Sequence, residues 1–313
     1  MSDTHFDPIA PAVPPAAPAV PPAAMTVPPA GPGAAAAPRQ APPFLSAAMR
    51  VFDLSLGQML WSRRTIFLGL LVGSPLALGI LFRVLEMLGV GGDVKMGGAA
   101  VSGPTVFGGM IWLLYLRFIV PVLGIFYGTA LIADEVDDKT ITYLFVRPIS
   151  RSAILVGKYL AYLVTTVFVV LPSVVILYLL VVPLGHGSLA ESFPALLKDL
   201  GLLGVGLASY GALFALIGAL FKYPLVTGLV FAFGWEQIAL ILPGYLRRLT
   251  MAYYLQALVP HAMPQDGLGG ALQALFRDVP SPTVSLIWLC GYVVVFLALA
   301  GRIVERREYV LEQ

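Results

Sequence analysis

The stretch DEVDDKTITYLFVRPISRSAILVGKY, Asp134–Tyr159, decides how the rest of the chain is read. Five of its first six residues are ionisable, and three more basic residues follow before its end. The apolar runs on either side are each long enough to cross a bilayer. We therefore predict a charged loop that emerges from a membrane on one face and contacts something in water.

The composition of the chain is that of a membrane protein. Of 313 residues, 58% are hydrophobic and 12% are charged, whereas soluble domains carry about 25% charged residues. The net charge of +2 and the lack of a basic patch interleaved with aromatic residues argue against nucleic-acid binding. The single cysteine, Cys290, excludes a disulfide within the chain and a Cys-based metal site. The three histidines lie far apart, so we predict no metal site, no cofactor bound by this chain and no catalytic residue.

The first 43 residues differ from the rest of the chain. Residues 1–43 hold 13 of the 26 prolines and few large apolar side chains, so we predict a disordered tail. A membrane domain is predicted over residues 44–313. It starts with Phe44–Arg64, predicted to be an amphipathic helix in the membrane interface, anchored by Trp61. The alternative is a plain helical lead-in to the first span. The predicted apolar face comprises Leu45, Ala48, Phe52, Leu56 and Met59.

Six apolar segments predict an all-α, polytopic membrane protein. Each approaches or exceeds the roughly 20 residues that cross about 30 Å of hydrocarbon. The predicted spans are about 66–85, 106–133, 159–184, 199–221, 225–243 and 284–301. Pro75, Pro121 and Pro172 lie inside spans and are predicted to kink them. In the long loop after the fifth span, Tyr245–Val259 is predicted to form a short helix over the outer mouth, with one face made by Leu246, Leu249, Tyr253 and Ala257.

Lysine and arginine predict the orientation. With the amino terminus in the cytoplasm, twelve of these residues fall on the cytoplasmic side and five on the far side. The positive-inside rule therefore predicts that both termini and the loop 134–158 lie in the cytoplasm. The predicted location of the protein is the inner (plasma) membrane.

The charged loop is predicted to be bent at Arg147-Pro148, because proline disfavours helix at the residue before it. Ser150 is then placed to cap a helix that runs through Gly157 into the third span. Upstream, one face of a short helix is formed by Val136, Thr140 and Leu144. The loop is thus predicted to be a charged elbow; the alternative is a solvated turn between two spans.

This segment resembles the cytoplasmic coupling region of ABC exporter permeases of the second type, the NosY-like membrane subunits. Those proteins share an acidic residue, Gly-Thr, a Leu-rich pair, Pro-x-Ser-Arg, and a Gly-Lys that opens the next helix. The matching residues here are Glu135, Thr140, Leu144, Pro148, Ser150, Arg151, Gly157 and Lys158. Lys139 stands where the family usually has glycine, and lysine does not readily adopt the left-handed turn that glycine permits.

The resemblance implies partners and a mechanism. Two such permeases, alike or different, pair in the bilayer, and each docks through the elbow on a separate cytoplasmic ABC ATPase. Closure of the ATPases, which bind the ATP, moves the elbow and rocks the spans between inward-facing and outward-facing arrangements. The residues implied in coupling are Asp134, Glu135, Thr140, Leu144, Pro148, Ser150 and Arg151. The chain has no G-x-x-x-x-G-K-[ST] loop, so we predict that it is not itself an ATPase.

Two ionisable residues lie inside predicted spans, Arg117 in the second and Glu236 in the fifth. Charge at membrane depth is costly and usually faces the bundle interior or a wet cavity. Their opposite signs and matched depth predict a pair beside the translocation path, with separate polar contacts as the alternative. Such a pair also supports a second functional hypothesis, an ion-coupled secondary transporter, although no clear inverted repeat is present. A third hypothesis is a membrane scaffold with no transport cycle.

Small residues recur at spacings of three and four in the fourth predicted span. They are Gly201, Gly204, Ala208, Gly211, Ala215 and Gly218. Small residues let membrane helices approach closely, so we predict tight packing within the bundle, or alternatively a dimer face. Motifs of intramembrane proteases and serine hydrolases are absent from the sequence, and nothing in it identifies the transported substrate.

Overall fold

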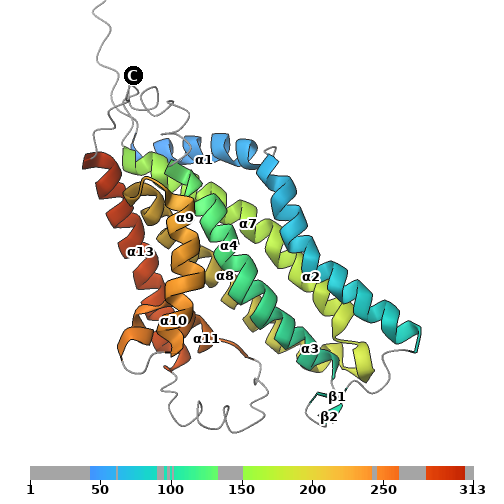
Figure 1. Cartoon of the computed structure of the whole chain (residues 1–313). Coiled ribbons are helices and arrows are strands. Elements are labelled where there is room, and N and C mark those ends of the chain that lie inside the picture. The colour runs from blue at the N-terminus through green and yellow to red at the C-terminus, as the bar shows by residue number, and fades with distance from the viewer. Residues whose placement is uncertain are drawn as a thin grey trace, which may run out of the picture. The chain divides into compact units, whose positions relative to one another are not determined.

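A computed structural model describes the chain over eight ranges, and the residues within them are almost all helical (Figure 1). The described ranges are 43–60, 63–89, 95–96, 99–100, 102–132, 151–241, 245–260 and 280–306. The predicted tail up to residue 42 and the elbow residues 133–150 lie outside them. A single antiparallel pair of two-residue strands, β1 (Lys95–Met96) and β2 (Ala99–Ala100), completes the described secondary structure.

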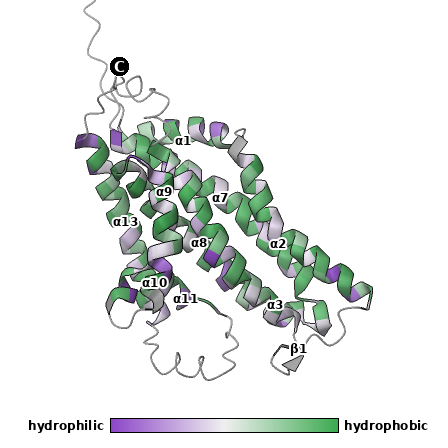
Figure 2. Ribbon diagram, in the orientation of Figure 1, coloured by the Kyte–Doolittle hydropathy of each residue, from purple (hydrophilic) through white to green (hydrophobic). Residues whose placement is uncertain are grey.

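Five helical stretches in the described part are long and apolar enough to cross a membrane. They are α2 (Arg63–Met87), the composite stretch Gly103–Ile132, α7 (Arg151–Val181), α8 (Leu189–Leu220) and α13 (Pro282–Arg306). Hydrophobic residues predominate along these stretches (Figure 2). The prediction of an all-α polytopic membrane protein is therefore confirmed, and the chain is a multi-pass membrane protein.

The second span departs from regular α-helix. It is made of α3 (Gly103–Met110), the π-helical η1 (Ile111–Ile119), α4 (Val120–Leu123) and the π-helical η2 (Gly124–Gly128). Pro121 lies between the two π segments. π turns are rare, and those that do occur are often found at functional sites. The second span is therefore a candidate location for a functional site.

Helix α8 begins ten residues before the predicted fourth span. The side chain of Ser188 accepts a hydrogen bond from the backbone N–H of Glu191 at 3.4 Å, which caps a helix that starts at Leu189. Asp199, predicted to begin the span, is instead fully buried inside the helix. The helix therefore extends ten residues beyond the start of the predicted span, and Lys198 and Asp199 both lie within it.

The fifth predicted span, 225–243, is not among the five stretches. It corresponds to α9 (Pro224–Leu229), the π-helical η4 (Val230–Trp235) and α10 (Glu236–Ile241), which follow one another without a break. The predicted short helix after it exists in two pieces, the 3₁₀ turn η5 (Tyr245–Leu249) and α11 (Met251–Gln256). The six-span count therefore stays a prediction.

The four residues predicted to share one face of that short helix are divided between its two pieces. Leu246 and Leu249 are exposed, whereas Met251, Tyr254 and Leu255 are buried. The helix breaks at Thr250, whose hydroxyl accepts from the N–H of Tyr253 at 3.4 Å and caps α11. The break changes the register, so the spacing of three and four does not continue across it.

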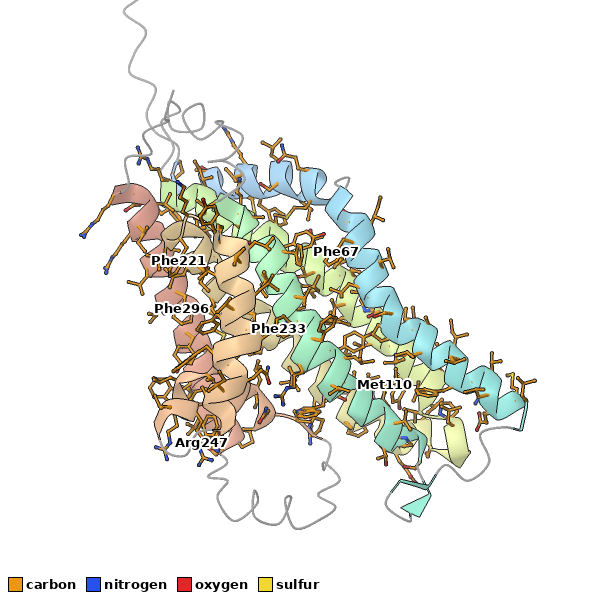
Figure 3. All side chains as sticks on the ribbon, in the orientation of Figure 1. Phe67, Met110, Phe221, Phe233, Arg247 and Phe296 are labelled. Carbon is orange, nitrogen blue, oxygen red and sulfur yellow. The ribbon has the colours of Figure 1, made fainter. Side chains whose placement is uncertain are left out.

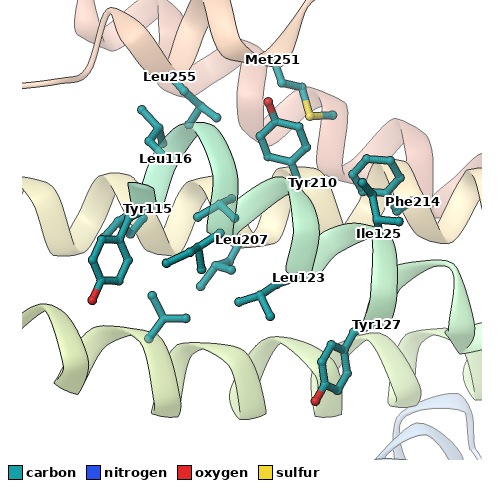
Figure 4. Close-up of a cluster of buried hydrophobic side chains, with 14 of the residues drawn as sticks. Tyr115, Leu116, Leu123, Ile125, Tyr127, Leu207, Tyr210, Phe214, Met251 and Leu255 are labelled. Carbon is teal, nitrogen blue, oxygen red and sulfur yellow. The ribbon is translucent and has the colours of Figure 1, made fainter. Parts of the chain in front are cut away.

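Helix α8 is the centre of the bundle. In its apolar window 72% of the residues are buried, against 22% in α2 and in α13, and it contacts α7, α13, α9 and the second span. Tyr210 and Phe214 of α8 belong to a cluster of buried side chains that also draws on the second span and α11 (Figure 4). A methyl group at Gly218 would lie 2.5 Å from the carbonyl oxygen of Thr129, so the two helices approach through glycine.

Helix α1 (Phe44–Leu60) is separate from α2 and lies across the end of the bundle at which α13 ends (Figure 1). The described helix runs to Leu60, Arg63 and Arg64 belong to α2, and the predicted anchor Trp61 lies outside the described residues. The predicted apolar face is only partly covered by protein, because Ala48 is buried but Leu45 is 77% exposed. Ala47 and Val51 add a second buried face, which packs on α7. The small side chains of Ala47 and Ala48 allow α1 to pack closely on α7. The spacing of apolar residues in the sequence does not reveal which helix α1 packs against.

Pro75 interrupts the hydrogen-bond ladder of α2, because proline has no N–H to donate to the carbonyl four residues before it. That carbonyl belongs to Leu71, and it accepts a hydrogen bond from the hydroxyl of Ser74 at 2.8 Å. That carbonyl is therefore satisfied from within α2, without a donor from a neighbouring helix.

Candidate functional site

The first candidate place is the end of α7 that adjoins residues 133–150. The predicted coupling residues Asp134, Glu135, Thr140, Leu144, Pro148 and Ser150 lie outside the described residues. Arg151 is described and is the first residue of α7. Its Nη1 donates to the carbonyl oxygens of Val304 and Glu305, both at 3.4 Å, in the last turn of α13. The last carbonyls of a helix lack partners within it and favour a positive charge, so Arg151 joins this end of the loop to α13.

Two neighbouring residues tie further helices to the same end of α7. The Nζ of Lys158 donates to the carbonyl oxygen of Leu131 at 3.3 Å, which joins the two helix ends that flank residues 133–150. At Gly157, an added Cβ would lie 2.5 Å from the carbonyl oxygen of Ala48 and 2.9 Å from the Cβ of Val51. Helix α1 thus rests directly on the backbone of α7, and only glycine allows that approach.

Removing the Arg151 contact is expected to loosen the last turn of α13. In an Arg151→Gln variant, the amides of residues 303–306 should exchange with deuterium several-fold faster, because hydrogen bonds to a charged donor are worth about 1.5 kcal/mol or more. Hydrogen–deuterium exchange read by mass spectrometry measures this.

The matched control is Arg302→Gln, which removes the same charge from an exposed side chain in the last part of α13. If both variants exchange alike, the Arg151 contact contributes nothing to the end of the helix. Amides in α2 should be unaffected in both.

The second candidate place is a cavity between the second span, α8, α10 and α11. Its polar residues are Trp112, Arg117, Tyr210, Glu236, Gln237 and Gln256. Arg117 comes from the π segment η1, and the π segment η4 immediately precedes Glu236. Arg247 on η5 lies at the same end of the bundle as α10 and α11 (Figures 1 and 3).

Glu236 is held by donors from two other elements. It is 1% exposed. Its Oε2 accepts from the Tyr210 hydroxyl at 2.6 Å, and its Oε1 accepts from the backbone N–H of Ala252 at 3.0 Å. The Tyr210 hydroxyl points toward Met251 at the start of α11 (Figure 4). Glu236 therefore fastens α11 to α10 and α8.

Arg117 contacts a different residue of α10. Its Nη2 donates to the Oε1 of Gln237, and its guanidinium lies 5.3 Å from the centre of the Trp112 ring. Arg117 and Glu236 thus line one cavity, but within the described residues they form no direct ion pair. The carboxylate of Glu236 accepts hydrogen bonds from Tyr210 and from α11, whereas Arg117 donates to the side-chain amide of the neighbouring Gln237.

The predicted small-residue stripe on α8 divides into two parts. Gly211 meets the Tyr162 ring, and Ala215 is fully buried. Around Gly201 and Gly204, in contrast, no described atom beyond the nearby backbone of α8 itself lies within 4 Å of where a Cβ would be. Ala208 lies between these parts, and its carbonyl oxygen accepts from the Tyr159 hydroxyl at 2.8 Å.

Two residues that line the cavity, Tyr210 and Gln237, were missed by sequence reasoning. Tyr210 sits in an apolar run, and no signal in the sequence distinguishes it. Gln237 carried a signal, because it adjoins a charged residue inside a predicted span.

Replacing Glu236 with leucine is expected to destabilise the chain by about 3 kcal/mol. The Tyr210 hydroxyl and the Ala252 N–H would both lose their acceptor in a buried place, at about 1–3 kcal/mol each. Glu236→Gln keeps an acceptor oxygen and should cost less, about 1 kcal/mol. Thermal unfolding of the purified chain in detergent measures both.

The double variant Glu236→Leu, Tyr210→Phe provides the control, because it removes the donor together with its acceptor. Its loss of stability should be smaller than the sum of the two single losses. Equal stability of the leucine and glutamine variants would contradict the assigned role of the carboxylate.

Comparison with known proteins gives one family. The family model described as ABC-2 family transporter protein matches residues 21–309. The match includes both candidate places and residues 133–150. No curated protein matches the chain.

Proposed function

Because the chain belongs to the ABC-2 family of transporter proteins, we propose that it is the membrane-spanning permease subunit of an ATP-driven exporter. It pairs in the inner membrane with a second permease, a copy of itself or a paralogue, with both termini in the cytoplasm. Each permease docks on a separate cytoplasmic ABC ATPase, which binds the ATP. The narrower likeness to NosY-like permeases stays a prediction.

The observation that best supports this proposal is the set of contacts that joins the helices next to residues 133–150. Lys158 joins α7 to the end of the second span, Arg151 joins α7 to α13, and Gly157 seats α1. A displacement applied to the loop would therefore reach several helices at once. In the proposed cycle the ATPases push the loop, and these contacts carry the movement into the bundle. The proposed docking residues are Asp134, Glu135, Thr140, Leu144, Pro148, Ser150 and Arg151.

Co-expression with a lone ABC ATPase encoded beside the gene tests the proposal. The wild-type chain should co-purify with that ATPase as a complex that hydrolyses ATP. A variant carrying Glu135→Lys and Leu144→Asp should lose the ATPase. The control Glu191→Lys changes the charge of an exposed residue in the first turn of α8 and should keep it. Co-purification and hydrolysis unchanged by the loop variant would sink the proposed docking site.

An ion-coupled secondary transporter is the second candidate, and the burial of Glu236 beside a cavity in the membrane favours it. The two candidates differ in what the chain does alone. Reconstituted in vesicles without an ATPase, an ion-coupled carrier would dissipate an imposed pH gradient when its substrate is present. A permease subunit would leave the gradient intact, and Glu236→Gln would then make no difference.

A further inference from the structure

The π segment η4 holds one residue more than an α-helix of the same length. In a π turn each N–H bonds the carbonyl five residues before it, against four in an α-helix. Every residue that follows a π turn therefore lies where its predecessor would lie in an unbroken α-helix. If η4 (Val230–Trp235) became α-helical, Glu236 would move to the place that Gln237 now holds.

The place that Gln237 holds is the one that faces Arg117. The Nη2 of Arg117 donates to the Oε1 of Gln237, and both residues line the same cavity as Glu236. In the described part of the chain Arg117 and Glu236 form no ion pair, although ionisable residues inside a membrane commonly pair with one another. A turn of α10 by one residue would therefore exchange the neutral partner of Arg117 for an oppositely charged one.

Such a turn would fall on α10 rather than on α9. Gly228 of α9 packs closely on the second span and α8, because an added Cβ would lie 3.3 Å from the side chains of Ile125 and Phe214. Helix α10 has six residues, and the two hydrogen bonds of Glu236 join it to α8 and α11. Those bonds would break as Glu236 turned, which would release α11. The cavity has room for about one water molecule, which can accept from the Tyr210 hydroxyl in place of the carboxylate.

We propose that η4 is a switch between two helix registers. In the present register Glu236 holds α11, and Arg117 bonds Gln237. In the second register η4 is α-helical, α11 is released, and Glu236 forms an ion pair with Arg117. The ion pair offsets the loss of the bonds to α8 and α11, because hydrogen bonds between two charged groups are stronger than those with a neutral partner. The inference rests on the proposed function, since a permease alternates between two arrangements of its spans.

Hydrogen–deuterium exchange of α11 in the purified full-length chain tests the switch. These amides exchange when α11 is released, and the ion pair with Arg117 stabilises the released state. Arg117→Gln removes the pair and should slow this exchange by about threefold or more. If Arg117 only held the bundle together, its loss would instead speed the exchange. Faster or unchanged exchange of α11 in a folded Arg117→Gln chain would therefore overturn the proposal.

Two further variants serve as controls for the exchange. Arg83→Gln removes the same charge from the end of α2, where Arg83 pairs with Glu86 at 2.9 Å, and should leave the exchange of α11 at the wild-type rate. Arg117→Lys keeps a cation for the pair and should slow the exchange less than Arg117→Gln does. Because the isolated chain is used, failure of the switch leaves ATPase docking intact, and failure of docking leaves the switch intact.

Deletion of Gly234 tests the register directly and decides the matter if Arg117→Gln does not fold. It removes the residue that the π turn adds, so an α-helical η4 would still present Glu236 to Tyr210 and α11. The shortened chain should unfold close to the wild type, and its α11 should exchange more slowly. Deletion of Gly291 from the regular helix α13 is the control, because it turns the following residues by about 100° and should destabilise the chain strongly. Equal losses of stability from the two deletions would overturn the switch.

Discussion

Replacing Gly211 with valine is expected to prevent the chain from forming a stable bundle. Gly211 is buried in the middle of α8, and a side chain there would overlap the ring of Tyr162 on α7. The ring has no room to move, because Tyr162 is fully buried and its hydroxyl donates to the carbonyl oxygen of Leu207 at 3.0 Å. Overpacking costs about 1–3 kcal/mol, and loss of a buried hydrogen bond adds about 1 kcal/mol. The total is large for a protein of ordinary stability.

The measurement is the thermal unfolding of the detergent-purified chain, together with its elution as a single species in gel filtration. The matched control is Gly204→Val, on the same stripe of the same helix but with no described atom near its Cβ position. The control should unfold close to the wild type. If Gly211→Val did so too, the close packing of α8 on α7 would not limit stability.

Replacing Gly157 with valine is expected to detach α1 from α7 and to leave the spans in place. The new side chain would meet the carbonyl oxygen of Ala48 and the Cβ of Val51. A backbone carbonyl cannot rotate away as a side chain can, so α1 itself must shift. Since the proposed elbow continues into this end of α7, the variant should also lose most ATP hydrolysis that depends on the permease.

Hydrogen–deuterium exchange of Phe44–Leu60 measures the detachment, and hydrolysis by the co-purified ATPase measures the coupling. Exchange in α1 should rise strongly while exchange in α8 stays at the wild-type level. Gly57→Val is the control, because it adds the same side chain to α1 at a position with open space around it. Wild-type exchange in Gly157→Val would show that α1 does not depend on this contact.

Much of the fold was predictable from the apolar runs. Helices α2 and α13 differ from their predicted spans by a few residues at each end, because each run is bounded by charged or breaking residues. The start of α8 was not predicted from hydropathy, although Ser188 and Glu191 have the S-x-x-E spacing of a capping box. The burial of Asp199, in contrast, required the packing to be known. Likewise, the buried face of α11 depends on a break at Thr250 that interrupts any periodic pattern.

The polar cavity was predictable only in part. The cost of charge in a membrane indicated Arg117 and Glu236, and both line the cavity. Their partners were not predictable, because the π segments of the second span and of η4 change which side chains face each other. The carboxylate of Glu236, which was predicted to pair with Arg117, instead accepts a hydrogen bond from the Tyr210 hydroxyl. At the other place, Gly157 and Lys158 were identified by resemblance, but their contacts with α1 and Leu131 were not.

The hydroxyl of Ser74, which bonds the carbonyl of Leu71 in place of the amide missing at Pro75, bears on how this protein fits bilayers of different thickness. A hydroxyl turns about its own side-chain bond, whereas a peptide N–H is fixed in the backbone. The two halves of α2 are thus free to tilt by different amounts while that carbonyl stays bonded. Among the five described stretches, α2 and α13 are the least covered by other helices. We therefore expect α2 to follow changes in bilayer thickness without exposing that carbonyl to acyl chains.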